Sequence, residues 1–256
     1  MLLATIGRVY ECEDEMLRNL PLLGKGQDVR DLPTYTIPEA AAQLAIDAWT
    51  LTSWYTGPDP ILKNSGWYGP AESIALLSFR DVEEAYKVYL LRHKFRQSMQ
   101  YLKKALVDAR LETKSDHPLL THKLIVFDHL ALEKPGRGGR RRQMIPLGSG
   151  SQVTLYIPEV VEAWGKRIVS DRSGKRTRIY PWINSRTDDA SRPVSMDPDV
   201  MSGRLVITGT RIPVQVIAGY VNSGRRIEEV AKLYHLDSEV VRQALQHVGP
   251  KIPKIS

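Results

Sequence analysis

The chain has 256 residues, 42% of them hydrophobic, which is enough for two modest domains that each bury a core. Its 36 lysines and arginines exceed its 29 aspartates and glutamates and give a net charge of +7, which favours nucleic acid as a partner without deciding the question. Because Cys12 is the only cysteine, an intrachain disulfide and a cysteine-rich zinc site are both excluded.

The sequence contains no candidate membrane or export signal. No run approaches the roughly 18 apolar residues of a transmembrane helix. The first residues turn acidic at Glu11–Glu15, too early for a secretory signal. We therefore expect a cytoplasmic protein. Residues 1–33 are predicted to be an extension that packs on its own domain or on a partner, or else a loosely ordered terminus.

A first helix-turn-helix is predicted at the start of a domain that spans residues 34–115. Thr36 is a suitable N-cap, and Pro38 and Glu39 follow it in the first turn. The apolar positions then have the spacing of small residue, turn residue and two anchors: Ala40, Ala41, Leu44, Ile46, Leu51 and Trp54. A Gly/Pro-rich stretch and two helices come next, with Ser78 and Asp81 as a capping pair at the first.

This order of helix-turn-helix, wing and helix pair resembles MerR-type winged-helix regulators over about residues 35–110. The resemblance implies a DNA-binding module, but Lys63 is the only basic residue in the wing. The presumed recognition helix offers Thr52 and Ser53 and no lysine or arginine. Electrostatic attraction supplies most non-specific DNA affinity, so a module with so few basic residues is poorly equipped to bind DNA. Its alternative roles are dimerisation and binding of a protein partner.

A basic, β-containing middle is predicted for residues 116–186. Short strands are expected at Thr121–Phe127, Leu130–Glu133, Gln143–Leu147 and Val153–Tyr156, a helix from Pro158 to Trp164, and a hairpin over 166–181 with its turn at Asp171–Gly174. A Gly-rich loop carries Arg137, Arg140, Arg141 and Arg142. Three interpretations of these arginines stay open: a solvent-exposed face without a partner, contacts with DNA phosphates beside the C-terminal domain, or binding to an acidic protein partner. Residues 187–193 are predicted to be a hinge.

The last segment, residues 194–250, reads as a glycine-punctuated arm followed by three amphipathic helices. Their predicted apolar faces are Val216, Ile217, Tyr220 and Val221, then Val230, Ala231, Leu233 and Tyr234, then Val240, Val241, Ala244, Leu245 and Val248. Gly224 suits a helix C-terminus and Asp237 an N-cap.

The second and third of these helices have the spacing of a helix-turn-helix, with Ala231, Leu236, Val241 and Leu245 at its fixed positions. His235 stands at the left-handed turn position, where many such motifs have glycine. The polar side chains expected to be exposed on the last helix suit base edges and phosphates: Ser238, Glu239, Arg242, Gln243, Gln246 and His247. The alternative is a structural or partner-binding trihelix.

The same segment resembles the DUF433 family, the helix-turn-helix domain of VapB-like antitoxins. It contains the run G-[RK]-x-x-I-x-G-T-R-I-P-V from Gly203 to Val214, although Arg226 stands where many relatives have a Ser or Thr cap. The resemblance implies an antitoxin of a type II toxin–antitoxin system, whose partners are operator DNA and a PIN-domain ribonuclease toxin. The residues expected to contact DNA are Thr210, Arg211, Arg225, Arg226, Ser238, Arg242, Gln243 and Gln246. Arg137, Arg140, Arg141, Arg142, Thr52 and Ser53 are candidates for DNA or toxin contact.

No pattern in the sequence predicts an enzyme, a cofactor or a metal. Phosphate-binding loops, nucleophile elbows and dinucleotide fingerprints are missing from the sequence. His117, His122 and His129 lack the spacing that places two ligands on one helical face. Asp197 and Asp199, which flank Pro198, suit a turn cap better than an acid/base pair.

We therefore predict an α+β fold that is mainly helical, with a MerR-like winged helix-turn-helix, a β-containing middle and a C-terminal helix-turn-helix. The predicted function is that of a homodimeric antitoxin that neutralises its toxin and represses its own operon. The alternative is a stand-alone MerR-like transcription regulator without a toxin.

Overall fold

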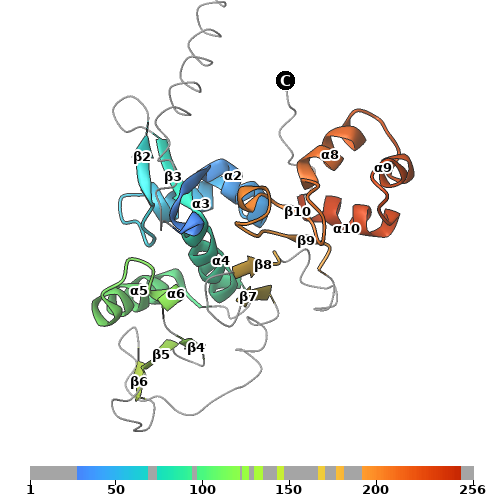
Figure 1. The fold of residues 1–256 in the computed structure, drawn as a ribbon. Helices are drawn as coiled ribbons and strands as arrows, with labels where there is room; N and C mark the ends of the chain where they lie inside the picture. The colour runs from blue at the N-terminus through green and yellow to red at the C-terminus, as the bar shows by residue number, and fades with distance from the viewer. Residues whose placement is uncertain are drawn as a thin grey trace, which may run out of the picture.

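The structure is a computed structural model that describes residues 28–68, 74–93, 97–121, 123–126, 130–134, 143–146, 167–170, 177–181 and 192–248. These residues form an α+β fold that is mainly helical, as predicted (Figure 1). Several predicted features lie outside them: residues 1–27, the strand 153–156, the helix 158–164, the hairpin turn 171–174 and most of the segment 187–193. None of the helices in the described ranges is long and apolar enough to cross a membrane.

The N-terminal helix-turn-helix is confirmed. Strand β1 (Pro33–Thr36) leads into α2 (Ile37–Leu44), and α3 (Ala48–Thr56) follows after a tight turn. At the start of α2, the Thr36 hydroxyl accepts from the Glu39 amide and the Glu39 carboxylate accepts from the Thr36 amide, which is the predicted capping box. Ala45 makes the turn with a φ of 54°, and the Asp47 carboxylate caps α3.

A three-stranded antiparallel sheet completes the winged helix-turn-helix. Strands β2 (Gly66–Tyr68) and β3 (Ile74–Ser78) form the wing, and β1 pairs with the other edge of β3, so the strand order is β1-β3-β2. Opposite pairs such as Tyr35 with Leu77 fix the register. The first strand therefore ties the wing to the base of α2.

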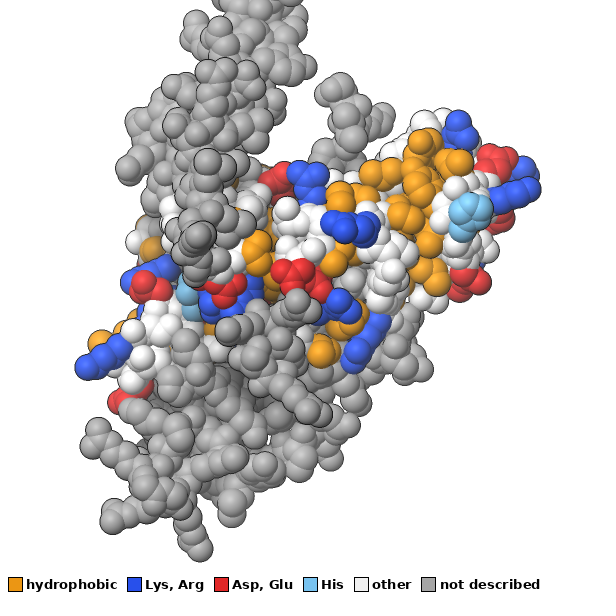
Figure 2. All heavy atoms as spheres, in the orientation of Figure 1, with side chains coloured by type: hydrophobic (Ala, Val, Ile, Leu, Met, Phe, Trp, Pro, Cys, Tyr) orange, Lys and Arg blue, Asp and Glu red, His pale blue; other side chains and the backbone are white. Residues whose placement is uncertain are grey.

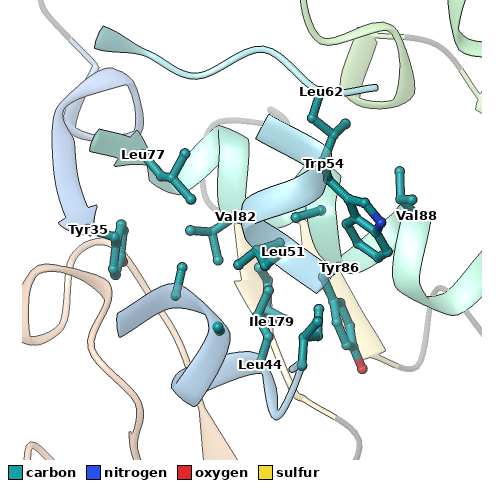
Figure 3. Packing of buried hydrophobic residues seen from close by; sticks show 14 of the residues in the cluster. Tyr35, Leu44, Leu51, Trp54, Leu62, Leu77, Val82, Tyr86, Val88 and Ile179 are labelled. Carbon is teal, nitrogen blue, oxygen red and sulfur yellow. The ribbon is translucent and has the colours of Figure 1, made fainter. Parts of the chain in front are cut away.

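Helix α4 (Phe79–His93) is the central element of the N-terminal core and is followed by α5 (Met99–Thr113) and α6 (Pro118–Thr121). Its predicted cap is confirmed, since the Asp81 carboxylate accepts from the Ser78 amide and the Asp81 amide donates to the Ser78 hydroxyl. Figure 3 shows side chains from α2, α3, β3 and α4 packed together, with Ile179 from much later in the chain among them.

After α6, the described part of the middle consists of short antiparallel strands. Strands β4 (Lys123–Val126), β5 (Leu130–Lys134) and β6 (Gln143–Pro146) form one sheet, within a few residues of the predicted strands. Strands β7 (Ile168–Ser170) and β8 (Thr177–Ile179) form the predicted hairpin. This hairpin bridges two parts of the molecule, because Ile179 pairs with Met196 through two backbone hydrogen bonds and Tyr86 of α4 donates to the Tyr180 carbonyl.

The C-terminal arm and trihelix follow. The arm contains β9 (Val194–Ser195), a turn at η4 (Met201–Gly203) and β10 (Val206–Ile207). The trihelix consists of α8 (Val214–Asn222), α9 (Ile227–Leu233) and α10 (Ser238–Val248), around a small core of Ile217, Val230, Ala231 and Val241. The predicted apolar faces were wrong at two positions: Val216 is 40% exposed and Leu233 is 52% exposed. A narrow bundle of three short helices buries only one stripe of each.

Contacts far apart in sequence hold the arm and α10 against the N-terminal module. The Tyr35 hydroxyl donates to the Ser202 carbonyl over 3.1 Å. The buried Gln43 side chain accepts from the Leu205 amide at 3.1 Å, and its backbone carbonyl lies 2.9 Å from Nε2 of His247. The main core also extends into the arm and trihelix, through Met196, Leu205, Ile207, Val214 and Ala244. The two helix-turn-helix units are thus joined by a shared core.

A buried charged cluster links α4 to α6. Nδ1 of His117 lies 3.0 Å from Oε2 of Glu84, and Nε2 lies 3.7 Å from Oδ1 of Asp81. Burial opposes a charge on His117, yet the hydrogen bond to Glu84 and the charges of Glu84 and Asp81 raise its pKa above the usual value. Burial also raises the pKa of Asp81, against the hydrogen bonds that it accepts from Ser65 and Ser78.

We expect replacement of His117 by glutamine to destabilise the protein in a pH-dependent way. A raised pKa in the folded state means that protonated His117 stabilises the fold fully below its unfolded pKa, and that this contribution fades as pH rises through the folded value. Hydrogen bonds to charged groups contribute about 1.5–3 kcal/mol. Urea titrations should therefore show the largest loss near about pH 6, below the usual histidine pKa, and a loss that decreases as pH rises through the raised pKa of the folded state. A loss that does not vary with pH would contradict the ion-pair role.

Candidate nucleic-acid interface

Helices α9 and α10 have the geometry of a helix-turn-helix. His235 adopts a φ of 53°, as its turn position predicts, and the Leu236 amide donates to the Ala231 carbonyl at 2.9 Å. The Asp237 carboxylate accepts from the Glu239 amide at 2.7 Å and so caps α10. The small side chain of Ala231 is buried where the two helices meet. The four fixed positions of the motif therefore behave as predicted.

The outward face of α10 carries half of the residues expected to contact DNA, namely Ser238, Arg242, Gln243 and Gln246. Ser238, Arg242 and Gln243 are partly exposed, and Glu239 and Gln246 are exposed. The prediction was wrong for His247, which is 3% exposed and contacts the Gln43 carbonyl of the N-terminal module. Besides its face toward α8 and α9, α10 buries a second face against α2, and His247 lies on this second face. The spacing of apolar residues in the sequence shows the first face but not the second.

Arg242, the central basic residue of this face, forms ion pairs with its own domain. Its guanidinium contacts the Glu239 carboxylate one turn earlier and lies 3.6 Å from Oε1 of Glu228 on α9. Gln243 also donates to Glu239, at 3.2 Å. Helix-surface pairs of this kind contribute only about 0.2–0.5 kcal/mol. Arg242 can therefore exchange its carboxylate partners for a phosphate or a guanine edge at a small cost.

The other predicted basic contacts lie at the turn before α9. The Arg225 guanidinium lies 5.4 Å from the centre of the Tyr220 ring, and Nε of Arg226 donates to Glu229 at 2.8 Å. Arg226 supplies no acceptor for the first turn of α9, so the cap is weaker there, as its sequence predicts. Figure 2 shows acidic and basic side chains next to one another at the far end of the trihelix. This surface is mixed in charge.

The N-terminal helix-turn-helix offers a less basic face. In α3, Thr52 is partly buried, and the exposed Ser53 hydroxyl donates to the Thr50 carbonyl at 2.7 Å. Trp49 is 81% exposed near the start of the same helix. The wing residue Lys63 forms an ion pair with Asp116. Helix α3 therefore presents an aromatic and two hydroxyl groups rather than a positive charge. The loop residues Arg137, Arg140, Arg141 and Arg142 lie outside the described ranges, and their contacts stay predictions.

The arm residues Thr210 and Arg211 lie in the turn just before α8. The Thr210 hydroxyl donates to the Ile207 carbonyl at 2.8 Å and accepts from the Ile212 amide at 3.1 Å, so it closes the turn that precedes α8. Gly209, in the same turn, has a φ of 80°, in the left-handed region that favours glycine. Arg211 is exposed and lines a cavity that separates the arm from the N-terminal module.

That cavity has a volume of about 730 Å³ and was not predicted from the sequence. One wall is formed by β1, the first turns of α2 and Leu76, and the other by the arm from Pro198 to Arg211. Arg204, which was not among the predicted site residues, joins Arg211 in this wall. The only sequence signal for this cavity was the presence of Arg204 and Arg211 in the run from Gly203 to Val214. The residues of the opposite wall lie more than half the chain away in sequence, so the sequence does not show that the two walls meet.

Comparison with known proteins places part of the chain in a family. Residues 194–247 match DUF433, described as a protein family of unknown function, so the chain carries a DUF433 domain at its C-terminus, as expected. The crystal structure of Rv2018 from Mycobacterium tuberculosis is similar, with a TM-score of 0.54 and 22% identity over 83% of this chain and 97% of that chain. At this identity the likeness concerns the fold alone. No curated protein matches the chain.

Proposed function

We propose that this protein is a VapB-like antitoxin that binds its operator through the DUF433 domain and neutralises a PIN-domain ribonuclease. The observation that carries the DNA-binding part is the helix-turn-helix geometry of α9 and α10, with its capped second helix and left-handed turn at His235. Arg242, Gln243 and Gln246 on the outward face have side chains suited to guanine and adenine edges. The net charge of +7 supports the same partner.

Two exposed apolar surfaces support protein partners. Val107 and Leu111 are exposed on α5, which suits pairing with a second copy of the chain. Val216 and Leu233 are exposed on the trihelix, which suits a toxin. A PIN-domain ribonuclease holds divalent metal among carboxylates, and a basic segment such as 137–142 could compete for that site. Dimerisation would bring two recognition helices to the half-sites of a palindromic operator.

The second candidate is a stand-alone MerR-like regulator that responds to an effector. The cavity between the arm and the N-terminal module favours it, because a volume of about 730 Å³ can hold a small molecule. The adjacent reading frame separates the two candidates. An antitoxin is expected to have a ribonuclease gene beside it, and its product should co-purify with this chain and lose its ribonuclease activity in the complex. An unrelated neighbour and an active, unbound ribonuclease would favour the stand-alone regulator.

Point variants test DNA recognition better than truncation. A chain that ended before Met196 would remove Met196, Leu205 and Val214 from the core of the N-terminal module, and loss of binding would then follow from unfolding. Arg242→Ala leaves that core intact. If Arg242 reads a guanine, the variant should lose about 1–3 kcal/mol of operator affinity and relax specificity at one base pair. If Arg242 contacts a phosphate, affinity for every sequence should fall and the salt slope should decrease by about one.

Fluorescence anisotropy titrations at several salt concentrations, on operator and scrambled DNA, would measure both effects. Arg80→Ala is the control, because Arg80 also forms ion pairs with carboxylates, those of Asp28 and Asp31, but lies at the start of α4 and is not among the residues expected to contact DNA. Unchanged affinity for both DNAs in Arg242→Ala would mean that the outward face of α10 does not meet DNA. A partner protein would then be the better use for that face.

A further inference from the structure

The cavity between the N-terminal module and the arm has the size of a ligand site. Its volume of about 730 Å³ lies within the range of roughly 300–1,000 Å³ found for small-molecule pockets. It exists only while the DUF433 domain is in contact with the N-terminal module, since Tyr35 and Ser202, which line it, are 167 positions apart in sequence. A molecule bound in it would therefore touch both modules.

An unusual backbone turn forms the rim of the cavity. Met201, Ser202 and Gly203 have φ values of 50°, 54° and 79°, so three consecutive residues are left-handed, and two of them are not glycine. Such conformations are unfavourable for residues with a side chain, and they concentrate at ligand clamps and switch regions. The Tyr35 hydroxyl holds this turn by its bond to the Ser202 carbonyl, and Arg204 follows directly, at the cavity wall.

Two arginines of this wall have no ion-pair partner among the residues that the structure describes. Within the ranges that the structure describes, neither Arg204 nor Arg211 forms an ion pair or a side-chain hydrogen bond, and both are exposed. The arginines of the trihelix differ, because Arg226 and Arg242 are both paired with glutamates. A guanidinium group binds carboxylate or phosphate through two parallel hydrogen bonds. The cavity therefore offers two anion-binding groups that the protein itself does not use.

The rest of the lining fits an anion that has an apolar body. Two carboxylates, Glu39 and Asp199, also lie in the wall and keep their charge. Glu39 already accepts hydrogen bonds from Thr36, and Asp199 has a further interaction within the chain, so the two arginines are the groups left to hold an anion. Burial raises the pKa of the Tyr35 hydroxyl, and the nearby charges of Arg204 and Glu39 act on it in opposite directions. The apolar part of the lining is supplied by Pro33, Leu76, Pro198 and Met201.

We propose that this cavity binds a small organic anion, a phosphate or a carboxylate on an apolar body, with Arg204 and Arg211 as the residues that hold the anionic group. The bound anion contacts both walls and so stabilises the DUF433 domain against the N-terminal module. This proposal goes beyond the DNA-binding function and does not depend on it. Binding is therefore measured on the full chain without DNA.

Thermal unfolding with AMP as the phosphate probe and citrate as the carboxylate probe tests the site, with adenosine as the uncharged control. At constant ionic strength and millimolar concentration, at least one anion should raise the melting temperature by about 2–4 °C, and adenosine should not. A response to AMP identifies phosphate, and a response to citrate identifies carboxylate. The variant Arg204→Gln/Arg211→Gln should lose the response. The control Arg225→Gln/Arg226→Gln removes the same charge outside the cavity and should retain it.

Three outcomes would overturn the proposal: no response to either anion, an equal response in the cavity variant and the control, or loss of affinity for scrambled DNA in the cavity variant without any response to the anions. The last result would assign the two arginines to the DNA backbone. If the double variant fails to fold, Thr34→Trp fills the cavity from the exposed edge of β1 and keeps both arginines. That variant should also lose the response, and a retained response would place the binding elsewhere.

Discussion

Replacing Gly203 with alanine should lower the free energy of unfolding by about 2–5 kcal/mol. Gly203 has a φ of 79°, and a Cβ atom there would lie 1.9 Å from the Tyr35 hydroxyl and 3.0 Å from a ring carbon of Phe79. Tyr35 would have to move, and its bond to the Ser202 carbonyl would break. The displacement of Tyr35 and the loss of its hydrogen bond both weaken the contact between the arm and the N-terminal module.

Gly209→Ala is the matched control for this experiment. Gly209 has a φ of 80°, but a Cβ atom there meets nothing within 4 Å. Only the backbone strain remains, which costs roughly 1–2 kcal/mol. Urea denaturation of both variants would measure the two losses. Equal losses would show that steric contact with Tyr35 contributes nothing, and an unchanged Gly209 variant would show that the left-handed conformation itself is not strained.

Replacing Gln43 with alanine should destabilise the same contact by about 1–3 kcal/mol. Its side-chain oxygen accepts from the buried Leu205 amide, and alanine leaves that donor without its partner. The bond between His247 and the Gln43 carbonyl involves the backbone and survives the substitution. The expected result is therefore a weakened arm with α10 still in contact, rather than complete separation of the two modules.

Hydrogen exchange would measure this effect residue by residue. The Leu205 amide should exchange faster in Gln43→Ala, while amides inside α9 and α10 should keep their protection. Gln215→Ala, an exposed glutamine on α8, is the control and should change neither stability nor exchange at Leu205. Faster exchange throughout the trihelix would mean instead that Gln43 supports the whole C-terminal domain.

The features that the sequence predicts well are local. The capping boxes at Thr36 and Ser78, the left-handed turn at His235 and the cap at Asp237 each depend on residues within four positions of one another. Side-chain chemistry alone decides such contacts. Both helix-turn-helix units could therefore be placed from their spacing.

The features that the sequence does not predict are contacts between distant segments. The burial of Gln43 and His247, and the cavity with Arg204, depend on how the arm approaches α2. A polar residue gives the same sequence pattern whether it faces water or a partner helix. The exposed side chains of α10 were therefore predicted correctly except for His247, which meets the other module.

The shared core has a consequence for synthesis of the chain. The partner of Tyr35, Ser202, is synthesised 167 residues after it, and the partner of Gln43, His247, is synthesised 204 residues after it. At roughly 5–20 residues per second, the N-terminal module waits on the order of ten seconds on the ribosome before the arm that closes its core is made. During that interval its apolar surface is open to chaperones and proteases. Cellular abundance of the protein is then sensitive to translation speed across its second half.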